Sequence, residues 1–289
     1  MTRVAAVLFD RDIQGRSIRV DLCGAPALVP VGAAEFAVRT GAIDLPGWRG
    51  LSFCADGTHT VPSDGRPASL RSRARISAAA ARAGKSVSEY YADIDRALEE
   101  IGEPVLLAGH STGGLVSSLY AADGARRESV RALWLNSPFF DWRLPDWRIA
   151  QLHLAAAVGR FFPFLKDEST LRADYVDRLL EDWEFDLRLK PRLGFPIYFG
   201  WLGAITDAHA RVRRGLGLQI PVLSMHSDEG DIVLDWRDIA KWSRTLGGNV
   251  AVLGFPGGQH DLVLSRAPVR EEVFRQLFAW AEPALALPA

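Results

Sequence analysis

Apolar residues recur with a helical period where the chain first becomes regular, near residue 86. The positions that repeat every three or four residues predict an amphipathic helix over about 86–102, and they are Tyr90, Ile94, Ala97, Leu98 and Ile101. Ser86 and Glu89 have the spacing of a capping box at its start, and Gly102 marks its end. Pro104 then prevents any continuation of the helix.

Short, continuously apolar runs follow and alternate with helical patterns. Such runs are typical of strands covered on both faces of a parallel sheet. The four predicted strands are 105–109, 131–138, 220–227 and 249–257. The helical patterns occupy 115–124, 235–246 and 268–280. Strands separated by helices indicate βαβ units, so the sequence predicts an α/β fold with a mostly parallel sheet and helices on both faces.

The alternation stops between residues 139 and 215. This segment is too long for a simple crossover, so we interpret it as a helical lid inserted into a core formed by 1–138 and 216–289. Its aromatic residues either form an apolar wall for a substrate or only pack the lid onto the core. They include Trp142, Trp147, Trp183, Trp201 and the run GRFFPFL.

Residues 10–88 differ in kind from the rest of the core. This window holds 14 Ala and 10 Arg but only one Glu and one Lys. The run VAAVLF (4–9) before it is compatible with a strand, and few periodic elements follow within the window. Two hypotheses account for this atypical part: it is poorly ordered, or part of it is translated out of frame from a GC-rich gene.

Charge and composition narrow the class of partner. The chain has 34 basic and 35 acidic residues, so no global field attracts nucleic acid, and a small neutral or apolar ligand is expected. No run approaches the roughly 20 apolar residues of a transmembrane segment, and the first apolar run is short for a signal peptide. A cytoplasmic location is therefore expected. Cys23 and Cys54 lack metal-site spacing.

The segment Gly109-His110-Ser111-Thr112-Gly113 lies between a predicted strand and a predicted helix. This GxSxG pattern in that context indicates a nucleophile elbow, in which the glycines avoid Cβ clashes and the serine projects above the carboxyl end of the sheet. The Thr112 N–H at the helix N-terminus is the expected oxyanion donor. The alternative interpretation is a glycine-rich turn without chemistry.

A serine nucleophile needs a base, and the base needs an orienting acid. His260 lies in a glycine-rich loop after the last predicted strand, where its ring can reach Ser111. Asp231 is the preferred acid because it ends the loop after strand 220–227. Asp228 is the alternative acid, and Asp235 is expected to cap the next helix.

Two further histidines are expected to be structural rather than catalytic. His110 should pack beneath the elbow, and His226 ends a predicted strand. His153 and His209 fall in the lid segment without a partner at metal-ligand spacing, so no metal site is predicted.

Four stretches together resemble the α/β-hydrolase superfamily, in particular serine hydrolases near the monoacylglycerol lipases and lysophospholipases, in an actinobacterial-looking branch. They are GHSTGGLVSSLY, LNSPFFDW, GDIVLD and GGQHDLVLS, and the resemblance covers residues 86–282. The resemblance implies hydrolysis of a carboxylic ester through an acyl-enzyme, with no cofactor. It also implies that Ser111, Asp231 and His260 form the catalytic triad.

One departure from the family pattern concerns the first third of the chain. The HG-type loop that supplies a second oxyanion donor in such enzymes is absent from residues 1–105, and Phe9 and Asp10 occupy the nearest corresponding place. Two alternatives to a lipase or esterase follow. The protein is a catalytically impaired binding or remnant protein, or it hydrolyses an amide or peptide bond.

Overall fold

A computed structural model describes residues 86–101, 104–167, 173–183, 192–193 and 197–286, together with strand segments between residues 8 and 54. Within this part of the chain the main sheet has six strands in the order β13-β12-β9-β8-β7-β6. Strands β13 to β7 pair in parallel, and β6 runs antiparallel to β7. Their bounds are β6 (Asp44–Leu45), β7 (Trp48–Cys54), β8 (Val105–His110), β9 (Val130–Asn136), β12 (Val222–Ser227) and β13 (Val250–Phe255).

The four strands predicted from apolar runs correspond to β8, β9, β12 and β13, so the predicted α/β fold with a mostly parallel sheet is confirmed. The predicted helices are also present. They are η2 (Val87–Tyr90) continued by α2 (Tyr91–Ile101), α3 (Thr112–Asp123), α7 (Trp236–Ser243) and α8 (Ala267–Ala286). Short 3-10 turns precede β9 and follow β13, at η3 (Arg127–Ser129) and η4 (Leu262–Leu264).

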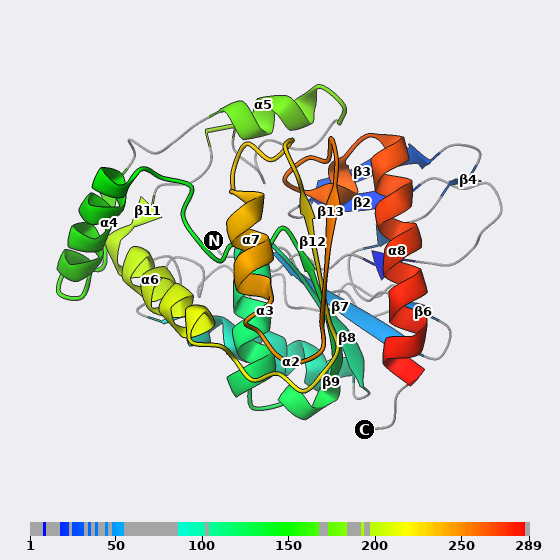
Figure 1. Ribbon diagram of the computed structural model, residues 1–289, viewed down its shortest axis with the longest axis horizontal. Helices are drawn as coiled ribbons and strands as arrows, with labels where there is room; N and C mark the ends of the chain where they lie inside the picture. The colour runs from blue at the N-terminus through cyan, green and yellow to red at the C-terminus, as the bar shows by residue number, and fades with distance from the viewer. Residues whose placement is uncertain are drawn as a thin grey trace.

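Side chains of β8 alternate between two apolar cores, one on each face of the sheet. Val105 and Leu107 belong to the core that includes residues of α2, α3 and α7. Leu106 and Ala108 belong to the core that includes residues of α8 and η4. Figure 1 shows this arrangement, with α8 on one side of the sheet and α3 and α7 on the other. Burial on both faces explains why β8 reads as a continuous apolar run rather than an alternating one.

The segment between β9 and β12 contains the elements α4 (Asp146–Gly159), β10 (Lys166–Asp167), α5 (Asp174–Leu180), β11 (Ile197–Tyr198) and α6 (Phe199–Arg213). Helix α6 packs into the core on the α3 face through buried residues such as Ile205 and Val212. Helix α5 lies across the carboxyl ends of β12 and β13 (Figure 1) and buries Val176 and Leu179. Helix α4 instead exposes large apolar side chains, including Trp147 and Leu154.

Strands also occur in the window that the sequence pattern left almost without elements. Just before it, β1 (Leu8–Phe9) lies in the run VAAVLF and pairs with β5 (Val38–Arg39) inside the window. Also inside the window, β2 (Ile18–Leu22) pairs with β3 (Ala25–Val31), which pairs with β4 (Ala34–Glu35). Strand β7 was missed because Arg49 and Gly50 interrupt its apolar run. Asp10 and Cys23 lie outside the described residues, as does most of the interval to which the reading-frame hypothesis applies.

Candidate active site

Ser111 occupies the turn between β8 and α3, at the carboxyl end of the sheet. Its backbone has φ 52° and ψ −121°, a conformation that residues other than glycine rarely adopt. The Ser111 N–H donates to the Asn136 carbonyl at 3.0 Å, and the Ser111 carbonyl accepts from Phe139 N–H at 2.9 Å. These bonds to the end of β9 and the segment after it hold the strained turn in place.

Gly109 has a steric role in this turn. A Cβ atom added at position 109 would lie 2.5 Å from the Gly113 carbonyl oxygen and 2.7 Å from Ser117 Oγ. The strand can therefore pass this close to the first turn of α3 only without a side chain at position 109. The absence of a Cβ atom at Gly109 thus avoids a clash with α3, which is the role that the sequence predicts for the elbow glycines.

Three side chains from distant parts of the sequence converge at this edge. His260 Nε2 lies 3.0 Å from Ser111 Oγ, and His260 Nδ1 lies 2.8 Å from Asp231 Oδ2. A carboxylate only accepts hydrogen bonds, so the Nδ1 atom carries the proton and Nε2 is free to accept the Ser111 hydroxyl. His260 and Asp231 are only 3% and 4% exposed, which shields this pair of hydrogen bonds from water.

Asp231 is held by its own loop as well as by the histidine. Its Oδ1 accepts hydrogen bonds from Val233 N–H at 2.7 Å and Leu234 N–H at 3.0 Å. Burial by itself would raise the pKa of Asp231, but the His260 ring and these two N–H groups outweigh it and hold the pKa below its usual value. The carboxyl group is therefore ionised at neutral pH despite its burial.

The alternative acid, Asp228, lies elsewhere. Its Oδ1 is 3.5 Å from Nδ1 of His226, and about a third of its side chain is exposed. The His226 ring stacks on Trp236 at 5.8 Å, and burial lowers the pKa of His226. The structure thus pairs His260 with Asp231 rather than with Asp228. Asp235 caps α7 by accepting from Arg237 N–H, as predicted.

His110 lies beside the catalytic candidates rather than away from them. Its ring centroid is 4.8 Å from that of His260, and its Nδ1 lies 3.0 Å from the Asn136 carbonyl oxygen. Because a carbonyl only accepts, Nδ1 of His110 is the donor in this bond. From the sequence, His110 is expected to pack beneath the elbow, and the structure places its ring against that of His260.

Sequence reasoning missed several residues that support the site. Arg143 Nη1 donates to the Asp231 carbonyl at 2.6 Å, and the Tyr175 ring on α5 lies edge-on to the His260 ring at 5.5 Å. Asn136 contacts both the elbow and the loop after His260. Only the stretch LNSPFFDW, which spans the end of β9 and the residues after it, carried a sequence signal, as a family-like run, and it did not indicate these contacts.

Helix α3 provides the candidate oxyanion donor. Thr112 is its first residue, so its N–H has no acceptor within the helix and lies next to Ser111. Phe9, at the place that corresponds to the second donor, belongs to β1, which pairs with β5 and not with a strand of the main sheet. Asp10 falls outside the described residues.

His209 and His153 are the remaining histidines in the described part of the chain. His209 Nε2 lies 2.9 Å from the Phe139 carbonyl oxygen within the core, and His153 is exposed on α4. Over the described ranges, no group of three or more His, Cys, Asp or Glu side chains could hold a metal ion. In the same part of the chain, no helix combines the length and the apolar character needed to cross a bilayer.

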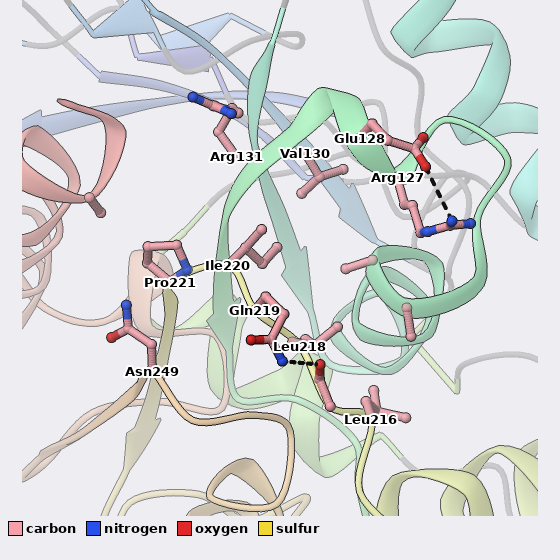
Figure 2. Close-up of a pocket in the computed structure, with 14 residues that line it drawn as sticks. Arg127, Glu128, Val130, Arg131, Leu216, Leu218, Gln219, Ile220, Pro221 and Asn249 are labelled. Atoms are coloured by element: carbon pink, nitrogen blue, oxygen red, sulfur yellow. Dashed lines mark hydrogen bonds and ion pairs between the residues drawn. The ribbon is translucent and has the colours of Figure 1, made fainter. Parts of the chain in front are cut away.

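A cavity of about 480 Å³ lies at the opposite, amino-terminal edge of the sheet, near the starts of β9 and β12 (Figure 2). Three of its polar side chains bind one another or nearby backbone. Gln219 donates to the Gly217 carbonyl at 2.9 Å, and Arg127 pairs with Glu128 at 3.2 Å. None of the residues around Ser111 lines it, so this cavity is separate from the candidate active site.

The sheet order, the elbow and the converging side chains define the class of protein as an α/β hydrolase. Residues 77–266 match the family model described as serine aminopeptidase, S33. The chain therefore belongs to this family. The predicted resemblance to the α/β-hydrolase superfamily, near monoacylglycerol lipases and lysophospholipases, is confirmed.

Individual relatives agree with this assignment. The chain is 25% identical over 237 residues to phospholipase YtpA of Bacillus subtilis (strain 168), covering 79% of this chain and 86% of the relative. The crystal structure of Paleococcus ferrophilus monoacylglycerol lipase matches with a TM-score of 0.53 and 25% identity, covering 68% of this chain and 76% of that one. A soluble variant of Saccharomyces cerevisiae monoglyceride lipase matches in fold, with a TM-score of 0.52 and 18% identity over 67% and 69% of the two chains.

Proposed function

We propose that the protein is a serine hydrolase that cleaves a carboxylic ester through an acyl-enzyme. The observation that carries the proposal is the continuous chain of hydrogen bonds from Ser111 Oγ through His260 to Asp231. A hydroxyl is a poor nucleophile until a base accepts its proton, and His260 is within hydrogen-bond distance to do so. Asp231 then stabilises the imidazolium that forms and keeps the ring oriented.

The proposed reaction has two halves. In the first, Ser111 Oγ attacks the ester carbonyl carbon while its proton passes to His260 Nε2, and the tetrahedral intermediate then expels the alcohol, which takes that proton. In the second, a water molecule attacks the acyl carbon as His260 removes its proton. The acid is released, and the proton returns to Ser111. The Thr112 N–H stabilises the oxyanion in both halves.

The proposed substrate is a small ester with an apolar acyl group. A phospholipase and a monoacylglycerol lipase are among the relatives, and both names refer to esters of fatty acids. The proposed lid, residues 139–215, supplies apolar surface beside the site. Tyr175 of α5 contacts the His260 ring. Elsewhere in the same segment, Trp147, Phe161 and Phe164 are exposed. No cofactor takes part in this mechanism.

The proposal predicts that a fluorophosphonate probe labels the folded protein at Ser111. Ser111→Ala should abolish labelling and lower ester turnover by about 10⁴-fold or more, because the nucleophile is removed. Ser117→Ala is the matched control: Ser117 is buried on α3, the helix that follows Ser111, and its hydroxyl has no hydrogen-bond partner among the described residues. The probe should label Ser117→Ala at Ser111 to the same extent as the wild-type protein. Labelling that survives in Ser111→Ala, or no labelling of folded wild-type protein, would refute the proposal.

A catalytically impaired binding protein is the second candidate. It is favoured by the position of Phe9 in a strand pair outside the main sheet, which leaves Thr112 as the one oxyanion donor identified in the described residues. Loss of one such donor costs about 10²–10³ in rate. Turnover of a short p-nitrophenyl ester separates the two candidates, since a binding protein would retain the ester without releasing nitrophenol.

Hydrolysis of an amide or peptide is a further alternative, and the description of the matched family as serine aminopeptidase favours it. The triad chemistry is the same for both bonds, but an amide nitrogen must be protonated to leave. Parallel assays with p-nitrophenyl esters and aminoacyl p-nitroanilides compare the two substrate classes directly.

A further inference from the structure

Asn136, the last residue of β9, contacts both halves of the candidate active site. Its backbone carbonyl accepts the Ser111 N–H at 3.0 Å and the His110 Nδ1–H at 3.0 Å. Its side chain binds the loop that carries the base, because Nδ2 donates to Asp261 Oδ1 at 2.7 Å and Oδ1 accepts from Leu262 N–H at 3.1 Å. The side chain is almost fully buried, at 4% exposure.

The neighbours of the amide determine its orientation. The Asp261 carboxylate only accepts hydrogen bonds, and the Leu262 N–H only donates. A single orientation of the Asn136 amide satisfies both, with the nitrogen toward Asp261 and the oxygen toward Leu262. Leucine at this position would supply neither group, and aspartate would bring a second carboxylate against Asp261.

We propose that Asn136 is a positioning residue that sets the distance between Ser111 Oγ and His260 Nε2. The backbone of one buried residue fixes the elbow, and its side chain fixes the two residues that directly follow His260. Movement of the loop that carries His260 would therefore change the distance between His260 Nε2 and Ser111 Oγ, which is 3.0 Å in this structure. Displacement of a reacting group by about 1 Å can cost on the order of 10² in rate. The proposal rests on the proposed hydrolase function for its kinetic consequences.

The test compares Asn136→Leu and Asn136→Asp with the wild-type protein. Both variants should lower kcat and the rate of fluorophosphonate labelling by about 10- to 100-fold, with KM changed by less than about threefold, because substrate contacts are untouched. Ser243→Ala is the matched control. It removes a buried hydrogen bond of 2.7 Å to Ser224, between α7 and β12, and should lower the melting temperature without changing kcat.

A charge-swapped double variant supplies the rescue. In Asn136→Asp with Asp261→Asn, the new amide at 261 can donate to the new carboxylate at 136, which still accepts from Leu262 N–H. The Val263 N–H, which donates to Asp261 Oδ1 at 3.2 Å, loses that acceptor, so the rescue is partial. The double variant should have a kcat above that of either single variant, Asn136→Asp or Asp261→Asn, and measuring all three completes the cycle. A purely structural role predicts instead that kcat follows the melting temperature, without rescue.

Two outcomes overturn the proposal. One is a wild-type kcat in both Asn136→Leu and Asn136→Asp, and the other is a rise in KM in these variants with kcat unchanged. If Asn136→Leu does not fold, Asn136→Asp and the double variant still decide the question. If the wild-type protein has no hydrolase activity, the proposed function fails by itself. The distance between Ser111 Oγ and His260 Nε2 in crystals of the variants then tests the positioning role, with lengthening expected in Asn136→Asp and not in Ser243→Ala.

Discussion

At the scale of single residues, the strained backbone of Ser111 places the hydroxyl above the sheet. Its φ of 52° lies in the region where a Cβ atom is unfavourable, and such conformations cost about 1–3 kcal/mol. The surrounding bonds from Phe139 N–H and to the Asn136 carbonyl maintain this conformation. The strained backbone of Ser111 therefore lowers the stability of the folded protein, and the proposed chemistry depends on this same residue.

This strain predicts an unusual order of stability for two inactive variants. The free energy of unfolding of Ser111→Gly should be about 1 kcal/mol higher than that of Ser111→Ala, because glycine tolerates positive φ. Chemical denaturation measures both. At Ser117, inside α3, the order should be reversed, since alanine favours a helix over glycine. An alanine variant at 111 that is as stable as the glycine variant would show that the turn is not strained.

A second residue-scale prediction concerns pH. Burial lowers the pKa of His209 to about 4, although the Phe139 carbonyl and Asp141 act in the opposite direction. The unfolded imidazole has a pKa of about 6.5, so between these pH values the unfolded state binds more protons than the native state. The free energy of unfolding should therefore rise as pH increases from 4 to 6.5, by about 3 kcal/mol from this residue, and be fully present above 6.5.

Denaturant unfolding at several pH values between 4 and 7 measures this dependence. His209→Gln keeps a donor for the Phe139 carbonyl but cannot titrate, so it should flatten the slope. His153→Gln, on the exposed side of α4, is the control and should leave the slope unchanged. Equal slopes for wild-type protein and His209→Gln would show that His209 does not cause this pH dependence of the free energy of unfolding.

At the scale of elements, the elbow depends on close approach of β8 and α3. The clash that a Cβ at position 109 would create involves the backbone of Gly113, which cannot move without displacing the first turn of the helix. Gly203, inside α6, is different: the nearest non-local atom to a Cβ there would be the Ala156 carbonyl oxygen at 3.5 Å, an ordinary contact. A Cβ atom would therefore clash at Gly109 but fit at Gly203.

Gly109→Ala should destabilise the protein by about 1–3 kcal/mol and reduce turnover, because Ser111 is displaced with the turn. Gly203→Ala should stabilise it by about 0.5–1 kcal/mol and leave turnover unchanged, since alanine favours the helix. Denaturant midpoints and initial rates measure both effects. Similar stability changes in the two variants would exclude the steric account of Gly109.

At the scale of the whole molecule, the first third of the chain remains distinct from the rest. The family match begins at residue 77, within the atypical window of residues 10–88. The match to phospholipase YtpA covers 79% of the chain, more than residues 86–282 alone contribute, so it also extends into this window. Strand β7 pairs with β8 along the full length of β8, from Arg49 opposite Val105 to Cys54 opposite His110.

The reading-frame hypothesis makes a direct prediction about this window. If part of residues 10–88 is translated out of frame, resequencing the gene should reveal an insertion or deletion there. Protein purified from its natural source should then yield tryptic peptides that match residues 86–282 but differ from the printed sequence within the window. Peptides that match the printed sequence throughout residues 10–88 would end the hypothesis.

Features that depend only on neighbouring residues follow from the sequence alone. The apolar runs of β8, β9, β12 and β13 and the glycines around Ser111 are local patterns, because each strand or tight turn is specified over a few residues. The α/β fold and its family could therefore be predicted from these patterns alone. Strand β7 could not, since Arg49 and Gly50 leave it without such a pattern.

The tertiary structure alone decided which distant side chains meet. Asp228 and Asp231 were both compatible with the sequence, and only the packed sheet places Asp231 against His260 and Asp228 beside His226. The contacts of Asn136 with the elbow and with Asp261 were equally invisible, because they join residues more than twenty positions apart. Such pairings follow from how parallel strands bring their carboxyl ends to one edge, a relation that no short stretch of sequence contains.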